Sequence, residues 1–306
     1  MARQRTSHIL MIEPVCFGFN DQTAASNSFQ HITDSIDNPQ KNALREFTEF
    51  VSELREAGID VTVIQDTEIP HTPDSIFPNN WFSTHDDGTL VLYPMATPNR
   101  RAERKEYVIQ SIKEQCHTQR VTDMSSSENN GMYLEGTGSM VLDRKNAVSY
   151  CALSHRTHRK KAEEWCAVMG YTPIFFNTHQ TNGTSIYHTN VIMSIGERIA
   201  VVCFDAMIDE SERRTVRESL ESSGRLCIGI SLEQMNNFAG NLLELQSAAG
   251  ASIWIMSDRA WHVLHPEQQS LLADGSTIIH PPLETIEQIG GGSARCMIAE
   301  LFAAVE

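Results

Sequence analysis

The feature that most limits how this chain can fold is a loose repeat with a period of roughly 50 residues. In each repeat, apolar residues at helical spacing are followed by a short turn and then by a short strand pattern. The helix and strand pairs are residues 42–56 with 59–64, 106–116 with 120–124, 158–169 with 172–176, 210–222 with 225–230, and 260–273 with 276–280.

A block of two further strands precedes each helix after the first one. The blocks are residues 77–93, 133–153, 185–204 and 238–256. An N-terminal strand at 8–14 completes the pattern beside an apolar stretch at 297–305, which we expect to form a closing helix. This content predicts an α/β protein, a five-bladed ring of repeated ββαβ modules whose block openings converge on one central channel.

The stretch between the first strand and the first helix, residues 21–40, is polar and has no hydrophobic period. A loop of that length in a compact domain is usually functional, so a lid over the channel is one interpretation. We expect the whole chain, residues 1–306, to form a single catalytic domain.

The bulk composition excludes several classes of function. A formal net charge of -15 argues against nucleic-acid binding, and the basic runs 100–105 and 156–161 are better explained as solvated faces. The seven cysteines contain no C-x-x-C pair, which favours neither a zinc site nor a disulfide framework. An odd cysteine count without a signal peptide or a membrane-length apolar run predicts a cytoplasmic protein with no membrane partner.

The block openings contain the residue types that nucleophilic catalysis requires. Cys296 follows the glycines at 290–292, His188 opens the third block and Glu135 opens the second. A thiolate, a proton shuttle and a carboxylate that orients the shuttle form a catalytic set. At the start of the expected closing helix, Cys296 would also gain from the helix dipole. The alternatives are a buried structural cysteine, a structural histidine and a turn carboxylate.

The order of these segments resembles the guanidino-modifying (pentein) superfamily, which includes arginine deiminases, dimethylarginine dimethylaminohydrolases and amidinotransferases. The matching stretches are residues 74–80, 98–101, 135–138 and 154–157, the strand at His188, and Cys296. The resemblance covers nearly the whole chain. It implies a pentein fold, a five-bladed α/β propeller, without a metal or organic cofactor and with a small amino-acid substrate.

The resemblance also implies a role for individual residues. Cys296 is the implied nucleophile, His188 the general acid and base, and Glu135 its partner. The implied substrate-binding residues are Asp74, Asn79, Asn80, Asn190, Arg101 and Arg156. Arg101 and Arg156 look like clamps for the substrate carboxylate, and Arg100 is an alternative to Arg101. The number of subunits is left open, with a homo-oligomer as one option.

Two departures from the deiminase pattern concern the substrate. Asn80 and Asn190 stand where the deiminases typically have aspartates that bind a cation. An amide both donates and accepts, and so complements the C=O and NH2 of a neutral ureido group. The chain therefore resembles the citrulline ureidase branch. We expect a thiocarbamate intermediate on Cys296, stabilised by backbone N–H groups near 292–296. The alternatives are a guanidino deiminase, a dimethylarginine hydrolase, an amidinotransferase or a non-catalytic binding protein.

Overall fold

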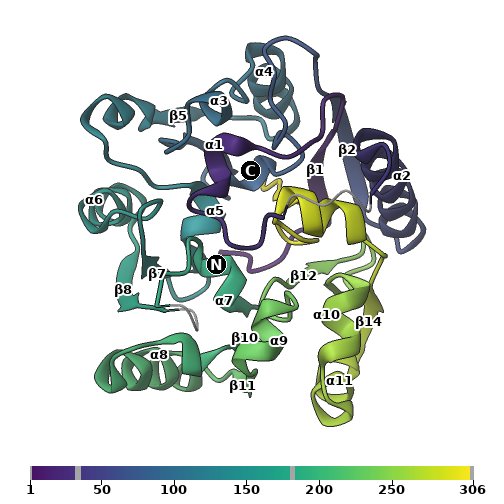
Figure 1. The fold of residues 1–306 in the computed structure, drawn as a ribbon. Helices are drawn as coiled ribbons and strands as arrows, with labels where there is room; N and C mark the ends of the chain where they lie inside the picture. The colour runs from purple at the N-terminus through teal and green to yellow at the C-terminus, as the bar shows by residue number, and fades with distance from the viewer. Residues whose placement is uncertain (1, 32–35, 180–182, 304–306) are drawn as a thin grey trace.

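The computed structural model describes residues 2–31, 36–179 and 183–303. Across these residues, fifteen strands form five three-stranded sheets, which are arranged around a central axis with helices on the outside (Figure 1). In every sheet the middle strand pairs antiparallel with one neighbour and parallel with the other. This architecture confirms the predicted five-bladed α/β propeller of ββαβ modules.

Four of the blades are continuous in the chain. Their strands are β3 (Phe82–Thr84), β4 (Thr89–Leu92) and β5 (Arg120–Asp123); β6 (Val141–Asp143), β7 (Val148–Leu153) and β8 (Thr172–Asn177); β9 (Met193–Ile195), β10 (Ile199–Val202) and β11 (Leu226–Gly229); and β12 (Leu243–Gln246), β13 (Ser252–Ile255) and β14 (Ser276–Ile279). The remaining blade joins β1 (His8–Glu13) and β2 (Asp60–Gln65) with β15 (Ala299–Glu300), so segments from both ends of the sequence close the ring.

An outer helix connects the middle strand of each blade to its parallel third strand, because a parallel pair needs a long crossover. These helices are α2 (Pro39–Glu56), α4 (Glu106–Gln115), α6 (Arg159–Met169), α8 (Glu210–Ser222), and the pair α10 (Asp258–Val263) and α11 (Pro266–Ala273). Each packs its apolar face on its sheet, as α2 does with buried Phe47, Phe50 and Leu54. The single helix expected at 260–273 is two helices, because Pro266 cannot lie inside one.

The closing helix expected at 297–305 is wrong within the described residues; positions 304 and 305 lie outside them. Cys296 lies in a turn, and the chain continues into strand β15, which pairs antiparallel with β1. Met297, Ile298 and Leu301 are all buried. A short run that is apolar on both sides fits a buried strand as well as a helix, and the free edge of β1 decides between them.

The polar stretch at 21–40 is also more ordered than expected; its residues 32–35 lie outside the described part. It contains the one-turn helix α1 (Asp21–Ala24), and α2 begins at Pro39 rather than at residue 42. The side chains of Asn20 and Asn38 accept hydrogen bonds from the first turn of α1 and of α2. Asparagine is a favoured cap, and proline is favoured just inside a helix start.

The N-terminal residues 3–6 cross the centre of the ring and contact all five blades. The contacts are Arg3 with Asp86, Gln4 with Leu142 and Ile195, Arg5 with Glu244, and Thr6 with Leu301. The segment therefore ties the blades together at one end of the channel.

Within the described ranges, no helix is long and apolar enough to cross a bilayer.

Candidate active site

The five block openings meet at the centre of the ring as short helical turns, each directly before an inner strand. They are η1 (Pro78–Asn80), α5 (Gly136–Ser139), α7 (Thr189–Ile192), the turn after α9 (Leu232–Asn236), and the turn after η4 (Ile286–Gly290). A buried cavity lies among them and is lined by Asp74, Asn80, Arg100, Arg156, His188 and Cys296, together with Asn27, Phe77, Tyr187 and residues 290–292. Its volume of about 10 Å³ is close to what one water molecule needs, so the site must widen to admit an amino acid.

Glu135 and His188 form a fully buried pair. The Nε2 of His188 lies 2.8 Å from Oε2 of Glu135, and the backbone N–H of Ala96 donates to Oε1 across 3.0 Å. Burial acts to raise the pKa of Glu135, but the charge of Arg156 and the contact with His188 outweigh burial and hold that pKa well below its usual range. Glu135 is therefore ionised and able to orient the imidazole.

His188 itself is neutral near pH 7. Burial lowers the pKa of His188 more than the hydrogen bond to Glu135 raises it. A neutral ring that donates its Nε2–H to a carboxylate carries its basic lone pair on Nδ1. That edge of the ring faces Gly138, where an added Cβ would lie 2.8 Å from Nδ1 and 2.5 Å from Nδ2 of Asn80. Only glycine fits at position 138. Because it has no side chain, the imidazole of His188 and the amide of Asn80 can both pack against it.

The thiol of Cys296 lies between two side-chain amides. Nδ2 of Asn241 lies 3.3 Å from Sγ, and Nδ2 of Asn190 lies 3.6 Å from it. No helix begins at Cys296, so the helix dipole expected from the sequence is missing there. The groups next to the sulfur are instead the two side-chain N–H donors of Asn241 and Asn190.

The glycines before Cys296 allow close packing against the cavity wall. A Cβ at Gly290 or Gly292 would lie within 2.9 Å of the Phe77 ring. Gly291 has a φ of +66°, and its carbonyl accepts from the hydroxyl of Tyr187 and from the amide of Asn27. This geometry holds the Cys296 turn between Phe77 and the 20–31 segment.

Asn80 has a defined amide orientation. Its Oδ1 accepts from Nη1 of Arg100 across 2.6 Å, and its Nδ2 donates to Oδ1 of Asn79 across 3.1 Å. Asn79 in turn contacts Thr137 of α5. Asn79 therefore lies behind Asn80 rather than in the cavity lining.

Arg100 and Arg101 occupy different environments, although both belong to α3 (Pro98–Arg101). Arg100 lines the cavity and makes a two-bond ion pair with Glu103, at 2.8 Å and 2.9 Å. Arg101 lies outside the cavity lining, and its guanidinium donates to the carbonyls of Met95 and Ala96. Arg100, which the sequence analysis gave as the alternative to Arg101, therefore lines the cavity, and Arg101 does not.

Asp74 and Arg156 connect the cavity to the 20–31 segment. Oδ2 of Asp74 accepts from Asn20 at 2.7 Å, whereas its buried Oδ1 has no partner within the described residues. Burial raises the pKa of Asp74, and the charge of Arg100 offsets this only in part. Arg156 donates to Ser26 at 2.7 Å and reaches Glu135 at 3.5 Å. The segment expected as a lid therefore lies against the site through these two residues.

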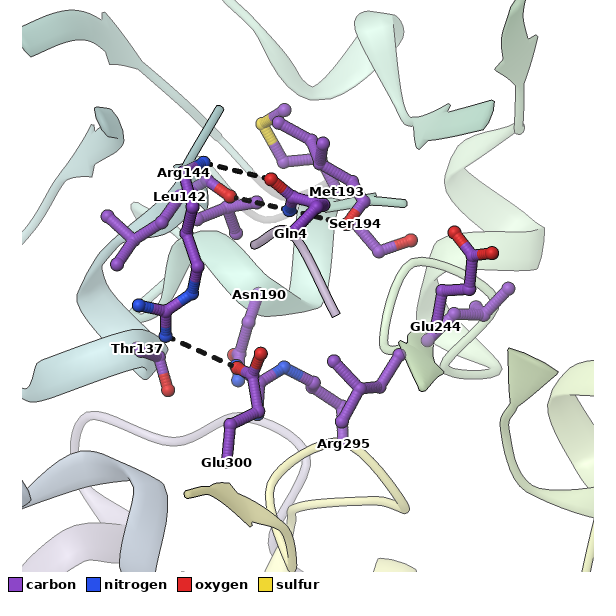
Figure 2. A pocket seen from close by; sticks show the side chains of 14 residues that line it. Gln4, Thr137, Leu142, Arg144, Asn190, Met193, Ser194, Glu244, Arg295 and Glu300 are labelled. Carbon is purple, nitrogen blue, oxygen red and sulfur yellow. Dashed lines mark hydrogen bonds and ion pairs between the residues drawn. The ribbon is translucent and has the colours of Figure 1, made fainter. Parts of the chain in front are cut away.

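A second polar cavity lies beside Asn190 (Figure 2). Asn190 and Thr137 line it, together with Gln4, Arg144, Arg295 and Glu300. Its volume is about 30 Å³. Oδ1 of Asn190 and Oγ of Ser194 are buried without a partner in the described part of the chain. Asn190 thus separates the thiol from a polar space that Gln4 of the N-terminal segment helps to close.

The structure thus gathers eight of the nine predicted site residues and leaves Arg101 aside. The residues missing from the sequence-based set are Arg100 as first choice, Asn27, Tyr187 and Asn241. The sequence gives Asn241 a positional signal, because it opens the fourth block at the position equivalent to His188 and Glu135, but no chemical one. Asn27 had none beyond its place in a long polar stretch. Within 2–31, 36–179 and 183–303, no group of three or more His, Cys, Asp or Glu side chains is placed to bind a metal ion.

Comparison with known proteins identifies the family of this chain. Residues 13–303 match the family described as N,N dimethylarginine dimethylhydrolase, eukaryotic. No curated protein sequence matches the chain.

Several solved structures share the fold. The apo form of ArgZ, an arginine dihydrolase from the ornithine-ammonia cycle in cyanobacteria, is 16% identical with a TM-score of 0.76, over 98% of this chain and 41% of that protein. AgrE in its ternary complex with ornithine and NAD+ is 19% identical with a TM-score of 0.76, over 98% and 40%. A dimethylarginine dimethylaminohydrolase is 14% identical with a TM-score of 0.65, over 97% and 99%. The chain therefore spans well under half of the ArgZ and AgrE chains, but nearly all of the last one.

The five-bladed fold and its central site define the class, namely the guanidino-modifying enzymes of the pentein superfamily. Within that class the chain belongs to the N,N-dimethylarginine dimethylhydrolase family, whose members are hydrolases.

Proposed function

We propose that this protein is a cysteine hydrolase of a neutral ureido group, with L-citrulline as substrate and ornithine, ammonia and carbon dioxide as products. Cys296 is the nucleophile, and residues 1–306 form one catalytic domain because all five blades contribute to the site. The observation that carries this proposal is the orientation of the two asparagine amides beside the cavity.

The two amides offer one donor and one acceptor. Arg100 can only donate, so the oxygen of Asn80 must face Arg100 and the NH2 of Asn80 must face away from it. That NH2 has two hydrogens and gives one to Asn79, which leaves the other for a ligand. Asn190 does the reverse: its NH2 faces Cys296, and its oxygen is unpartnered among the described residues. A ureido group has a C=O for Asn80 and an NH2 for the oxygen of Asn190, whereas a guanidinium only donates. Asn190 lies outside the lining of the Cys296 cavity, so the widening of the site must also bring its oxygen to the substrate.

The first chemical step follows from these positions. The Cys296 thiolate attacks the ureido carbon, and Asn80 together with backbone N–H groups of the Cys296 turn stabilises the oxyanion. A donor of this kind is typically worth about 3 kcal/mol of transition-state stabilisation. Nδ1 of His188 takes up the thiol proton of Cys296 when the thiolate forms. The C–N bond to the terminal nitrogen then breaks, His188 passes this proton to the departing nitrogen, and ammonia leaves behind an S-carbamoyl cysteine.

The second step consumes one water molecule. Nδ1 of His188 accepts a proton from water, and the oxygen attacks the thiocarbamate carbon. The C–S bond breaks, the Cys296 thiolate is regenerated, and ornithine carbamate leaves and decomposes to ornithine and carbon dioxide. Glu135 holds the imidazole and offsets its positive charge after each proton transfer.

The amino-acid end of the substrate needs charged partners. Arg156 is our candidate for the carboxylate, because it lines the cavity and contacts the 20–31 segment that has to move. The unpartnered oxygen of Asp74 is a candidate acceptor for a substrate N–H. A clamp role for Arg101 requires its side chain to leave the carbonyls of Met95 and Ala96.

The second candidate is a guanidino substrate, either arginine or a methylated arginine. The family match and the arginine dihydrolase ArgZ favour it, and the Asp74 carboxylate could accept from a guanidinium. In this case the same thiol would attack a guanidinium carbon.

Changing Asn80 or Asn190 to aspartate separates the two candidates. Ornithine formed from citrulline should fall at least about 100-fold in each variant. At position 80 a carboxylate cannot donate to the substrate oxygen and repels the oxyanion, and at position 190 it repels the Cys296 thiolate. Asn236→Asp, at an exposed position, is the matched control. Retention of citrulline turnover in both site variants, or wild-type turnover of arginine alone, would refute the ureido assignment.

A further inference from the structure

We propose that Asn241 is a further catalytic residue, which holds the Cys296 sulfur and stabilises its thiolate form. The inference rests on the proposed function only in taking Cys296 as the nucleophile. It does not depend on whether the substrate is a ureido or a guanidino compound.

The contacts of Asn241 fix the direction of its amide. Its side chain is fully buried, and Nδ2 donates to the backbone carbonyl of Asn190 across 2.9 Å. A carbonyl only accepts, so the NH2 of Asn241 must lie on this side. The same nitrogen is 3.3 Å from Sγ of Cys296, whereas Oδ1 is 3.6 Å away. One N–H therefore belongs to Asn190 and the other points at the sulfur.

The backbone around Asn241 is built to hold this position. Phe238 has a φ of +63°, a left-handed conformation that costs a phenylalanine free energy. Gly240 packs so closely on α7 that a Cβ would lie 2.2 Å from the carbonyl oxygen of Val191. The N–H of Asn241 closes the turn by donating to the carbonyl of Phe238 at 2.8 Å. A strained turn wedged against the neighbouring blade is typical of a segment whose end group must be positioned accurately.

The charge environment explains why neutral donors are needed here. The titratable groups that face Cys296 across the cavity are Asp74, Arg100, Arg156, Tyr187 and His188, and Arg295 precedes it in the chain. Arg100 and Arg156 are engaged with Glu103 and Glu135, and His188 is neutral near pH 7. In the proposed function Asn190 also has to bind the substrate NH2 through its oxygen. Asn241 is then the side-chain donor that stays with the sulfur through attack and release.

The test measures the thiol without any substrate. Wild type, Asn241→Ala, Asn241→Asp and the exposed control Asn236→Ala are treated with iodoacetamide between pH 5 and 10, and alkylation of the Cys296 peptide is followed by mass spectrometry. Circular dichroism checks that each variant is folded. Loss of a donor to a charged group should slow alkylation at pH 7 by about tenfold and move its pH midpoint up by about one unit. Asn241→Asp should move the midpoint further, because its carboxylate opposes the thiolate.

The outcomes separate this inference from the proposed function. If folded Asn241→Ala and Asn241→Asp alkylate at Cys296 like wild type at every pH, Asn241 is merely structural and the inference is overturned. If wild-type Cys296 is no more reactive than the other cysteines, the nucleophile assignment fails first. If Asn241→Asp does not fold, Asn241→Ala alone gives the comparison.

Discussion

Nη1 of Arg100 donates to Oδ1 of Asn80 across 2.6 Å, inside a site where both side chains are almost completely buried. This contact decides which end of the Asn80 amide faces a ligand, and so which substrates the site can complement. Arg100 is itself fixed by its two bonds to Glu103. In the proposed function, the substrate preference of the site therefore depends on the buried ion pair between Arg100 and Glu103.

Arg100→Ala should lower the free energy of unfolding by about 3 kcal/mol, because it leaves the Glu103 carboxylate buried without its partner. Arg101→Ala should cost less than about 1 kcal/mol, since the Arg101 side chain is 30% exposed. Urea denaturation of the two variants measures the difference. Equal losses would contradict the distinct environments of the two arginines.

Glu135→Gln should lower kcat about 100-fold or more while the fold is retained. Glutamine can still contact His188, but it carries no charge to stabilise the imidazolium that forms during turnover. Steady-state kinetics measure this effect. The control is Glu163→Gln, because Glu163 is exposed. A kcat within a few-fold of wild type would show that the carboxylate does not assist His188.

Glu287 should make the protein less stable as the pH rises from about 4.5 to about 7. Burial raises the pKa of Glu287 from 4.5 to about 7, against the opposing effect of hydrogen bonds from Ser257 and Ser293 and the charge of Arg259. Between these values the folded state binds a proton that the unfolded state has released, so its contribution to stability is full below pH 4.5 and is lost by about pH 7.

Glu287→Gln should remove this contribution of about 3 kcal/mol. The difference in unfolding free energy between wild type and variant, measured at pH 4.5 and at pH 7.5, checks it. Wild type should lose unfolding free energy relative to the variant between pH 4.5 and pH 7.5. A difference that does not change with pH would mean that the pKa of Glu287 is not raised by folding.

Gln4→Ala should lower the free energy of unfolding by about 2 kcal/mol. Its amide donates to the carbonyls of Leu142 and Ile195 and accepts from the N–H of Arg144, and the deletion leaves these buried groups unpaired. Gln110→Ala, on the exposed face of α4, is the matched control and should change stability little. Equal melting temperatures for Gln4→Ala and wild type would show that residues 3–6 do not tie the blades.

Much of the fold could be predicted from the sequence, because each blade repeats the same helical and strand periods. The prediction for the closing segment is wrong, because the run from Met297 to Ala299 is apolar throughout and its partner β1 is almost 300 residues away in the chain. The break at Pro266 was overlooked as well, although proline gives a direct local signal for it.

The site was predictable where position and residue type agree. Cys296, His188 and Glu135 each stand at a block opening, so the repeat itself brings them together. The difference between Arg100 and Arg101 could not be read from the sequence, because it depends on which face of the short helix α3 points to Glu103. Asn241 is at an equivalent opening, but an asparagine in a turn is common and gives no chemical signal without the neighbouring sulfur.

The most direct test of the account is the stoichiometry of products from L-citrulline and, separately, from L-arginine. The purified protein is incubated with each substrate without added metal, with Cys296→Ala alongside, and ammonia, ornithine and citrulline are quantified over time. The account predicts one ammonia per ornithine from citrulline, little product from arginine, and no turnover by Cys296→Ala. Conversion of arginine to citrulline, or to ornithine faster than citrulline is consumed, would contradict the assignment of a neutral ureido substrate.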